Sequence, residues 1–243
     1  MPKLSVNINK IATLRNARGE NMPDLINSAI DIINFGADGI TVHPRPDERH
    51  IKYDDVIKLS NILNKEFNIE GNPNDKFMRL IKDVKPTQVT LVPDSIKAIT
   101  SNSGWDTKEN FSFLKDIIEE LKSYSIRTSI FVNPSLEMIE NAKKLSADRI
   151  ELFTGQYALQ FNDDKEKAIR PYIESAKLAE EINIGVNAGH DLNQVNLKYF
   201  KDSINNLLEV SIGHALICES IYEGLEKTIK SYLDILNDEN SSL

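Results

Sequence analysis

Three side chains suited to proton transfer lie at or near the ends of short apolar segments: His43, Glu70 and His190. Histidine titrates close to neutral pH, and partial burial can raise the pKa of a glutamate toward the same range. These residue types can therefore act as general acids and bases. They can act together only where the fold brings the three segment ends to one place.

Two other interpretations stay open from the residues alone. His43, Glu70 and His190 could bind zinc, although they are far apart in the chain and lack the H-E-x-x-H spacing of a helical zinc site. Glu70 could instead be a buried structural carboxylate paired with Lys10 or Arg18. Acid–base chemistry is favoured because three of the four histidines of the chain lie near segment ends.

Groups that bind phosphate form a second set. Arginine forks match phosphate oxygens, and backbone N–H groups after the last strands of an α/β barrel often bind phosphate. A solvent-exposed charged segment is an equally simple interpretation of residues 47–49. The candidates are Arg15, Arg18, Arg45, Arg49 and His50, followed later in the chain by Gly189 and Gly213.

Other residues near segment ends could also carry chemistry. Lys10 could form a Schiff base with a carbonyl substrate, as in barrel aldolases. The single cysteine, Cys218, is interpreted as a small buried apolar residue. Polar residues to which we assign no separate role at this point are Asn7, Asn9, Glu151, Thr154 and Asn187.

The elements that position these residues alternate along the chain. Short β-type runs alternate with longer runs whose apolar residues recur every three or four positions, as in a helix. Predicted strands cover residues 4–9, 39–43, 68–71, 88–92, 127–133, 149–153, 184–187 and 208–212. Predicted helices cover residues 23–35, 53–67, about 73–84, 110–124, a segment after Ser135 as N-cap, a segment around 173–182, 197–204 and about 221–236.

Eight strand–helix pairs in 243 residues predict a closed (β/α)₈ (TIM) barrel that forms a single domain over residues 1–243. A doubly wound open sheet is the alternative, but no G-x-G-x-x-G follows the first strand and no P-loop motif occurs. Because the active site of such a barrel lies at the carboxyl ends of its strands, the candidate residues are expected to meet there.

Composition excludes several other classes of protein. The chain carries 37 acidic and 29 basic side chains, for a net charge of −8, which argues against non-specific nucleic-acid binding. One cysteine permits no internal disulfide and fits a reducing compartment. No apolar run is long enough to span a membrane, and the N-terminus lacks the pattern of a signal peptide. We therefore expect a cytoplasmic protein.

With these residues in view, the sequence resembles the pyridoxine 5′-phosphate synthase family over about residues 5–236. Several long motifs in the right order make the match specific. They are VNINKIATLRNARG (6–19), GADGITVH (36–43), DERHI (47–51), NIE (68–70), QVTLVP (88–93), IELFTGQYA (150–158), VNAGH (186–190) and IGHALI (212–217).

The resemblance implies a TIM-barrel homo-octamer that joins 3-amino-2-oxopropyl phosphate to 1-deoxy-D-xylulose 5-phosphate without metal or organic cofactor. It implies proton acceptors at His43 and Glu70 and a proton donor at His190. Residues that it places against the substrates and the retained phosphate are Asn7, Asn9, Lys10, Arg18, Arg45, His50, Thr100, Gly213 and His214.

The sequence departs from the commoner family pattern at three places. Asn9-Lys10 stands where Asp-His is usual, Pro44 stands where leucine is common, and Asp191 stands where glycine is usual. We count Asp191 among the substrate-binding residues because it follows His190 directly. Its carboxylate would repel a nearby phosphate unless it points away. A barrel aldolase or isomerase working through Lys10 and a non-catalytic binding barrel are the rival functions.

Overall fold

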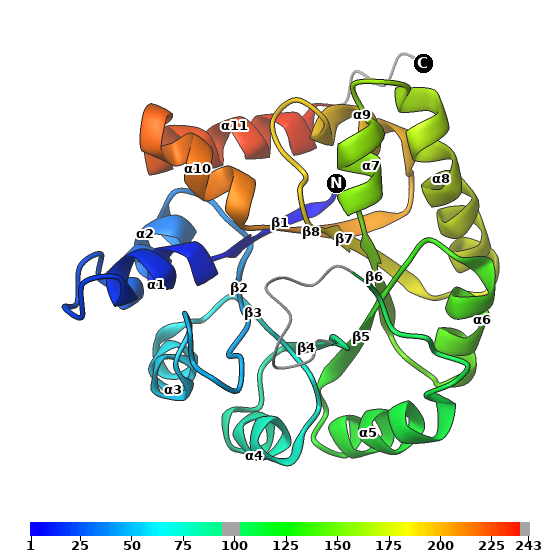
Figure 1. The fold of residues 1–243 in the computed structure, drawn as a ribbon, viewed down its shortest axis with the longest axis horizontal. Helices are drawn as coiled ribbons and strands as arrows, with labels where there is room; N and C mark the ends of the chain where they lie inside the picture. Colours follow the sequence, from blue (N-terminus) through cyan, green and yellow to red (C-terminus); the bar gives the residue numbers. More distant parts are fainter. Residues whose placement is uncertain (94–102, 239–243) are drawn as a thin grey trace.

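Parallel strands form a closed barrel in the computed structural model, which describes residues 1–93 and 103–238 (Figure 1). Neighbours in the barrel follow chain order, and the last strand pairs with the first. The fold predicted from the sequence is therefore confirmed. Within the described residues the strands are β1 Lys3–Asn7, β2 Gly39–Val42, β3 Glu66–Gly71, β4 Gln88–Leu91, β5 Arg127–Val132, β6 Arg149–Phe153, β7 Gly185–Gly189 and β8 Leu207–Ile212.

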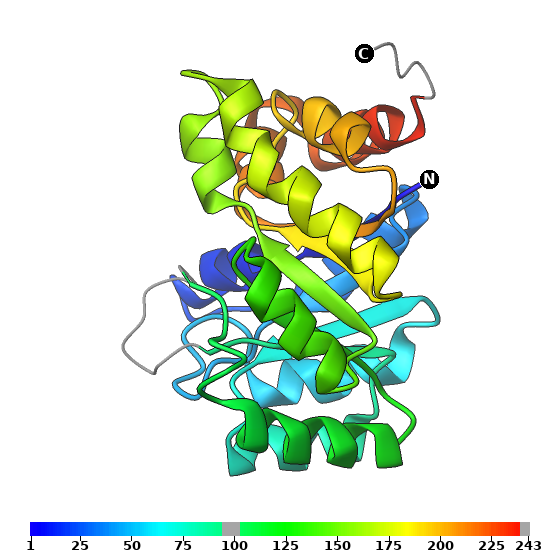
Figure 2. The same cartoon turned by 90° about the vertical axis from the view of Figure 1, so that its right-hand side faces the viewer.

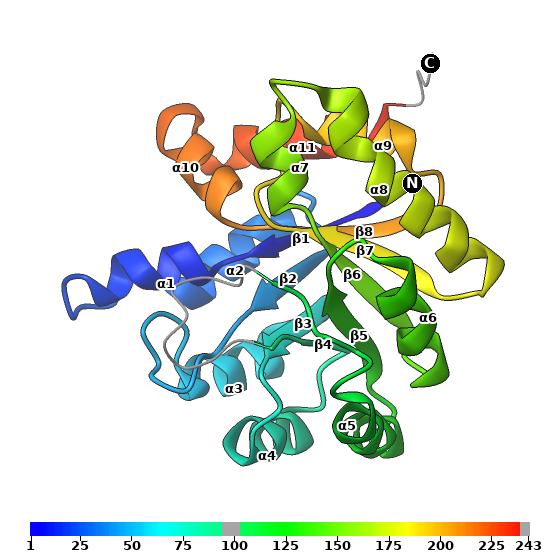
Figure 3. The ribbon, with the colours of Figure 1, turned by 45° about the vertical axis from the view of Figure 1, so that its right-hand side comes forward.

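Helices surround the strands on the outside of the barrel, as the two views in Figure 2 and Figure 3 show. None of those in the described part of the chain is long and apolar enough to cross a membrane. The helices are α1 Asn9–Asn16, α2 Leu25–Asn34, α3 Tyr53–Ile62, α4 Asp75–Val84, α5 Phe111–Ser123, α6 Leu136–Lys144, α7 Gly155–Gln160, α8 Lys165–Glu181, α9 Leu197–Ser203, α10 His214–Glu223 and α11 Leu225–Asn237.

The two faces of each strand differ in chemistry, because side chains alternate along a strand. Apolar residues such as Ile40 and Val42 are fully buried in the main hydrophobic core. Polar residues between them face the barrel interior, as hydrogen bonds between non-neighbouring strands show. Thr90 on β4 donates to Glu151 on β6 (3.3 Å), and Ser211 on β8 donates to Glu70 on β3 (3.4 Å). The barrel interior therefore contains polar as well as apolar side chains.

The first strand is shorter than predicted. The alternating pattern of residues 4–9 predicts a strand through Asn9, but β1 ends at Asn7 and α1 begins at Asn9. The Asn7 side chain accepts a hydrogen bond from the Asn9 backbone N–H (3.0 Å), the two-residue reach typical of an Asx-turn. That bond turns the chain out of the barrel, so Asn9 and Lys10 belong to a helix rather than to a strand end.

The predicted boundary between the helix over residues 53–67 and the strand over residues 68–71 was also wrong. Leu63 and Phe67 match helical spacing, yet α3 ends at Ile62 and Leu63 is extended (φ −77°, ψ 126°). Phe67 pairs with Ile40 across the β2–β3 ladder. Pairing in the barrel therefore overrides the local apolar period in this segment.

Other local predictions were corrected as well. Pro23 was expected in the first helical turn, but α2 begins at Leu25 and Asp24 caps it by accepting the Asn27 N–H (2.9 Å). The helices α7 and α10 were not predicted, and Ser135 occupies its N-cap position without a side-chain hydrogen bond. Cys218 is exposed on α10 rather than buried.

Candidate active site

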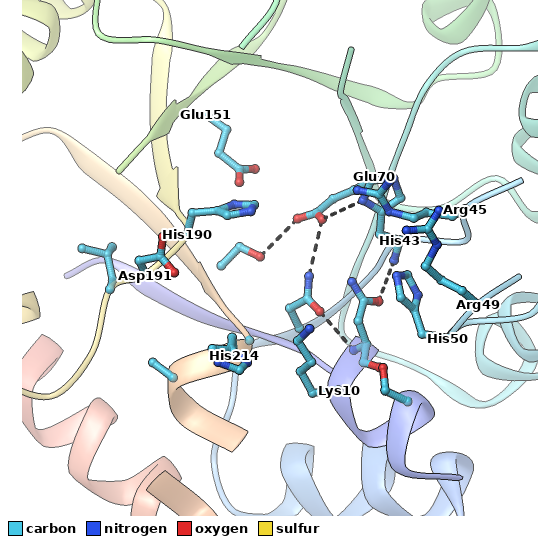
Figure 4. A pocket seen from close by; sticks show the side chains of 17 residues that line it. Lys10, His43, Arg45, Arg49, His50, Glu70, Glu151, His190, Asp191 and His214 are labelled. Carbon is cyan, nitrogen blue, oxygen red and sulfur yellow. Dashed lines mark hydrogen bonds and ion pairs between the residues drawn. The ribbon is translucent and has the colours of Figure 1, made fainter. Parts of the chain in front are cut away.

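A cavity of about 610 Å³ opens at the carboxyl ends of the strands (Figure 4). In Figure 4, Glu151 and His190 lie on one side and face Glu70 across the space. The lining residues are Asn7, Asn9, Lys10, Thr13, His43, Arg45, Arg49, His50, Glu70, Glu151, His190, Asp191, Leu192, Ser211, Gly213, His214 and Ala215. Segments distant in sequence therefore meet at one place.

Most of the site residues predicted from the sequence line this cavity, but the predicted phosphate ligands Arg15, Arg18 and Gly189 are not among its lining residues. Arg18 is exposed just beyond the end of α1, and Thr100 lies outside the described residues. Arg15, its neighbour one helical turn earlier, is buried in a two-point ion pair with Asp55 (2.7 and 2.8 Å). Arg15 thus supports the structure instead of binding a ligand.

Glu70 lies at the centre of a small polar cluster. Its carboxylate accepts hydrogen bonds from the Asn7 amide and the Ser211 hydroxyl, both at 3.4 Å. The His43 Nδ1 atom is 3.7 Å from Glu70 Oε2, and both side chains are more than nine-tenths buried. Among the described residues, no ion pair or hydrogen bond joins Glu70 to Lys10 or Arg18. Glu70 is therefore held in place while still facing the cavity.

His43 is held in its neutral form, which leaves one ring nitrogen able to accept a proton. Burial lowers its pKa well below the usual value, and the positive charge of Arg45 lowers it further, with smaller effects from His50, His190 and Arg49. The imidazole is thus neutral at neutral pH. The Asn9 side-chain oxygen accepts the His43 backbone N–H (2.9 Å), so Asn9 fixes the end of β2 where His43 lies.

Positive groups occupy the other wall of the cavity. Arg45 is almost fully buried, while Arg49 and Lys10 are more accessible. Burial lowers the pKa of His50 to about 4, and the charges of Arg45, Lys10 and Arg49 act in the same direction. The Ile51 N–H donates to His50 Nδ1 (2.9 Å), so the neutral ring carries its hydrogen on Nε2. This wall offers cations and a neutral donor to an anionic ligand.

Glu151 is the residue that sequence reasoning placed on the sixth strand without giving it a role. It is 2% exposed, and burial raises its pKa well above the usual value, with further increases from the charges of Glu70 and Glu209. Burial and the neighbouring carboxylates therefore favour the protonated form of this carboxyl group, which can donate a hydrogen bond or a proton. A lone glutamate between Ile150 and Leu152 is the sequence signal for its inward direction.

His190 follows β7 and faces Glu70 from the opposite wall (Figure 4). Its ring lies 5.5 Å from the Phe131 ring centroid and 5.6 Å from that of Phe153. Asp191, the next residue, is exposed at the edge of the cavity. Figure 4 places Asp191 on the side of His190, away from Arg45.

Gly213 and His214 begin α10 at the rim. Gly213 is the N-cap residue, and the first backbone N–H groups of a helix favour anions. His214 is exposed, and the Cys218 sulfur lies 3.7 Å from its Nε2 atom. The structure thus places the predicted phosphate-binding glycine in a position suited to that role.

The sequence leaves open that His43, Glu70 and His190 bind zinc. In residues 1–93 and 103–238, no group of three or more His, Cys, Asp or Glu side chains is arranged to hold a metal ion. The expectation of catalysis without metal stays a prediction.

Comparison of the sequence with known proteins identifies the family of this chain. The family described as "Pyridoxal phosphate biosynthesis protein PdxJ" matches residues 4–238. This chain belongs to the PdxJ family. A pyridoxine 5′-phosphate synthase from Cytophaga hutchinsonii is 58% identical over 233 residues, which cover 96% of this chain and 98% of that relative. One from Parabacteroides distasonis is 57% identical over 98% of this chain and 100% of that relative.

Solved structures of other barrels share only the fold with this chain. Phosphoribosyl anthranilate isomerase from Thermotoga maritima aligns with a TM-score of 0.60 at 14% identity and covers 97% of this chain and 98% of its own. A tryptophan synthase from M. tuberculosis aligns with a TM-score of 0.65 at 11% identity and covers 97% of this chain and 94% of its own. These similarities support the fold alone.

Proposed function

We propose that this PdxJ-family enzyme condenses 3-amino-2-oxopropyl phosphate with 1-deoxy-D-xylulose 5-phosphate to give pyridoxine 5′-phosphate, phosphate and water. The observation that carries the proposal is the cavity itself, where Glu70 and His43 face Glu151 and His190 beside a cationic wall (Figure 4). The near-full-length identity to named synthases supports the same reaction. The proposal treats residues 1–243 as one catalytic barrel.

Two phosphorylated substrates require two anion sites. Lys10, Arg45 and His50 supply a cationic site on one wall, which suits the deoxyxylulose phosphate. Gly213 and His214, at the start of α10, suit the phosphate that the product retains. Asn7 lies between these walls and faces the aminoketone. Arg18 and Thr100 stay in the proposal as substrate contacts on the strength of the family resemblance.

The chemistry joins an amine to a ketone, expels water and phosphate, and closes a ring through a carbon–carbon bond. Each step moves protons, so groups with different proton affinities must surround the intermediates. The neutral imidazole of His43 and the carboxylate of Glu70 accept protons from the substrates. His190 donates a proton to departing oxygen, and the Glu151 carboxyl group, whose pKa is raised by burial, lies beside it as a second donor.

A pair of matched variants tests the acid–base assignment. Glu70→Gln keeps the size of the side chain and removes the proton acceptor, so kcat should fall by about 10²–10⁴ with KM nearly unchanged. Glu137→Gln makes the same chemical change on the exposed surface of α6, outside the cavity lining, and should keep kcat of the wild-type order. Equal rates in wild type and Glu70→Gln would remove Glu70 from the mechanism.

The rival aldolase-type mechanism would use Lys10 as a covalent nucleophile. Lys10 is exposed on α1 and lines the cavity at its edge. Borohydride added during turnover should leave the mass of the chain unchanged if the proposed mechanism operates. A substrate adduct trapped on Lys10 would favour the rival.

The proposal also includes a homo-octamer in the cytoplasm, as the family resemblance implies. Light scattering on purified protein should give the mass of eight chains. A monomeric mass at full activity would contradict the assembly but leave the assigned chemistry in place.

A further inference from the structure

The segment after β7 holds an unusual backbone conformation. His190 and Asp191 have φ angles of 77° and 55°, in the left-handed region that side chains with a Cβ atom seldom adopt. Two such residues in succession persist only where surrounding contacts hold them, and such sites often carry function. The contacts that hold His190 therefore bear on where its imidazole points.

Thr154, the residue after β6, provides such a contact. It is fully buried, and its hydroxyl group contacts the carbonyl oxygens of both Gly189 and His190. Its backbone N–H also donates to the Gly189 oxygen (3.1 Å). Because a hydroxyl group has one hydrogen and Gly189 already receives the N–H, the hydroxyl hydrogen is available to the His190 carbonyl.

Within the described residues, the Thr154 hydroxyl group makes no hydrogen bond to the helix that follows it. Thr154 occupies the N-cap position of α7, where threonine commonly accepts a hydrogen bond from the helix. Here the side chain makes no capping hydrogen bond. The hydroxyl instead reaches across to β7, so its placement serves the His190 segment rather than the helix that follows it.

The imidazole itself rests on two aromatic rings. Phe131 and Phe153 are buried, lie 5.6 Å apart between centroids, and each approach the His190 ring at a tilted or edge-on angle. Gly155 leaves room for this arrangement, since a Cβ atom there would lie 2.4 Å from the Phe153 ring. Thr154 thus contacts the backbone of His190 and the two phenylalanines contact its ring, so both parts of the residue are supported where it faces the cavity.

We propose that Thr154 is a positioning residue, whose hydroxyl holds the left-handed backbone of His190 and thereby aims the imidazole at the substrate. This inference rests on the proposed function in so far as His190 acts as a proton donor. It concerns a residue that does not line the cavity and that contacts the backbone of Gly189 and His190 behind it.

The test compares Thr154→Val, which keeps the shape and loses the hydroxyl, with Thr154→Ser, which keeps the hydroxyl. Steady-state kinetics and NMR of ¹⁵N-labelled histidines are measured on both, and the His190 signals are identified by their loss in His190→Gln. Thr154→Val should lower kcat about 10- to 100-fold, as for other small misplacements of a catalytic group, with little change in KM. Its His190 signals should shift while those of His43 and His50 stay in place.

Thr154→Ser should keep both kcat and the His190 signals close to wild type. A Thr154→Val protein with wild-type kcat and unchanged His190 signals would overturn the inference. So would equal damage in the serine variant, because the hydroxyl would then not be the group that matters. If the valine variant does not fold, Thr154→Ala compared with Thr154→Ser carries the same test.

The two readouts separate this inference from the proposed function. The NMR comparison needs no substrate, so it decides whether Thr154 positions the ring even if the wild-type protein forms no product. Absence of product in the wild type would contradict the proposed function alone.

Discussion

Replacing Asp55 by asparagine should destabilise the protein strongly, because it breaks a buried ion pair that supports the site. Arg15 and Asp55 join α1 to α3 through two bonds of 2.7 and 2.8 Å, with side chains 8% and 9% exposed. The same guanidinium donates to the His50 carbonyl (3.2 Å). The ion pair therefore connects the His50 segment of the cationic wall to α1 and α3.

The size of the effect follows from burial. Removing one partner of a buried pair leaves a charge without its counter-charge, which costs about 3–5 kcal/mol. Asparagine keeps one acceptor oxygen for Arg15, so about 3 kcal/mol is expected. For a chain of this length that corresponds to a fall in Tm of about 6–12 °C.

Thermal unfolding followed by circular dichroism measures this difference against an adjacent control. Asp54→Asn makes the same change one residue earlier, where Asp54 pairs with Lys58 on the exposed side of α3. Exposed ion pairs contribute little to stability, so this variant should unfold close to the wild-type temperature. Similar Tm values for Asp54→Asn and Asp55→Asn would refute the reasoning from burial.

Three further substitutions have signs that follow from the structure. Gly189→Ala should lower kcat, since its Cβ would lie 2.6 Å from a Glu151 oxygen; an unchanged rate would contradict this close approach. Burial raises the pKa of Glu209 to about 7, so the folded state binds extra protons between about pH 4.5 and 7 and stability falls as pH rises through that window. Glu209→Gln should remove this slope in urea unfolding. Burial lowers the pKa of His50 to about 4, so the unfolded state binds extra protons below about pH 6.5 and stability falls as pH drops toward 4. His50→Gln should be less sensitive to acid, and an equal loss in both proteins would argue against a buried neutral His50.

The strands could be predicted because both of their faces are buried. Segments such as residues 88–92 and 149–153 combine β-branched residues with a period of two, and each lies in the barrel close to the predicted limits. The α1 helix was missed because the same period continues through Ile8. The turn at Asn7 depends on one side-chain hydrogen bond, which alternation alone does not reveal.

The site residues could be predicted by type, since polar groups at strand ends converge in a barrel. Their states could not. Whether Glu151 carries a proton depends on Glu70 and Glu209, which come from other strands. That Arg15 is held away from the cavity depends on Asp55, 40 residues further along the chain. Pairing between distant segments decides these properties.

The most direct test of the account supplies the purified protein with both phosphorylated substrates in the presence of EDTA. Pyridoxine phosphate fluorescence and released phosphate are followed in the same reaction. The account predicts product and phosphate in equal amounts at a rate that EDTA does not change. Folded protein that forms no product, or forms it only without EDTA, would contradict the proposed synthase mechanism.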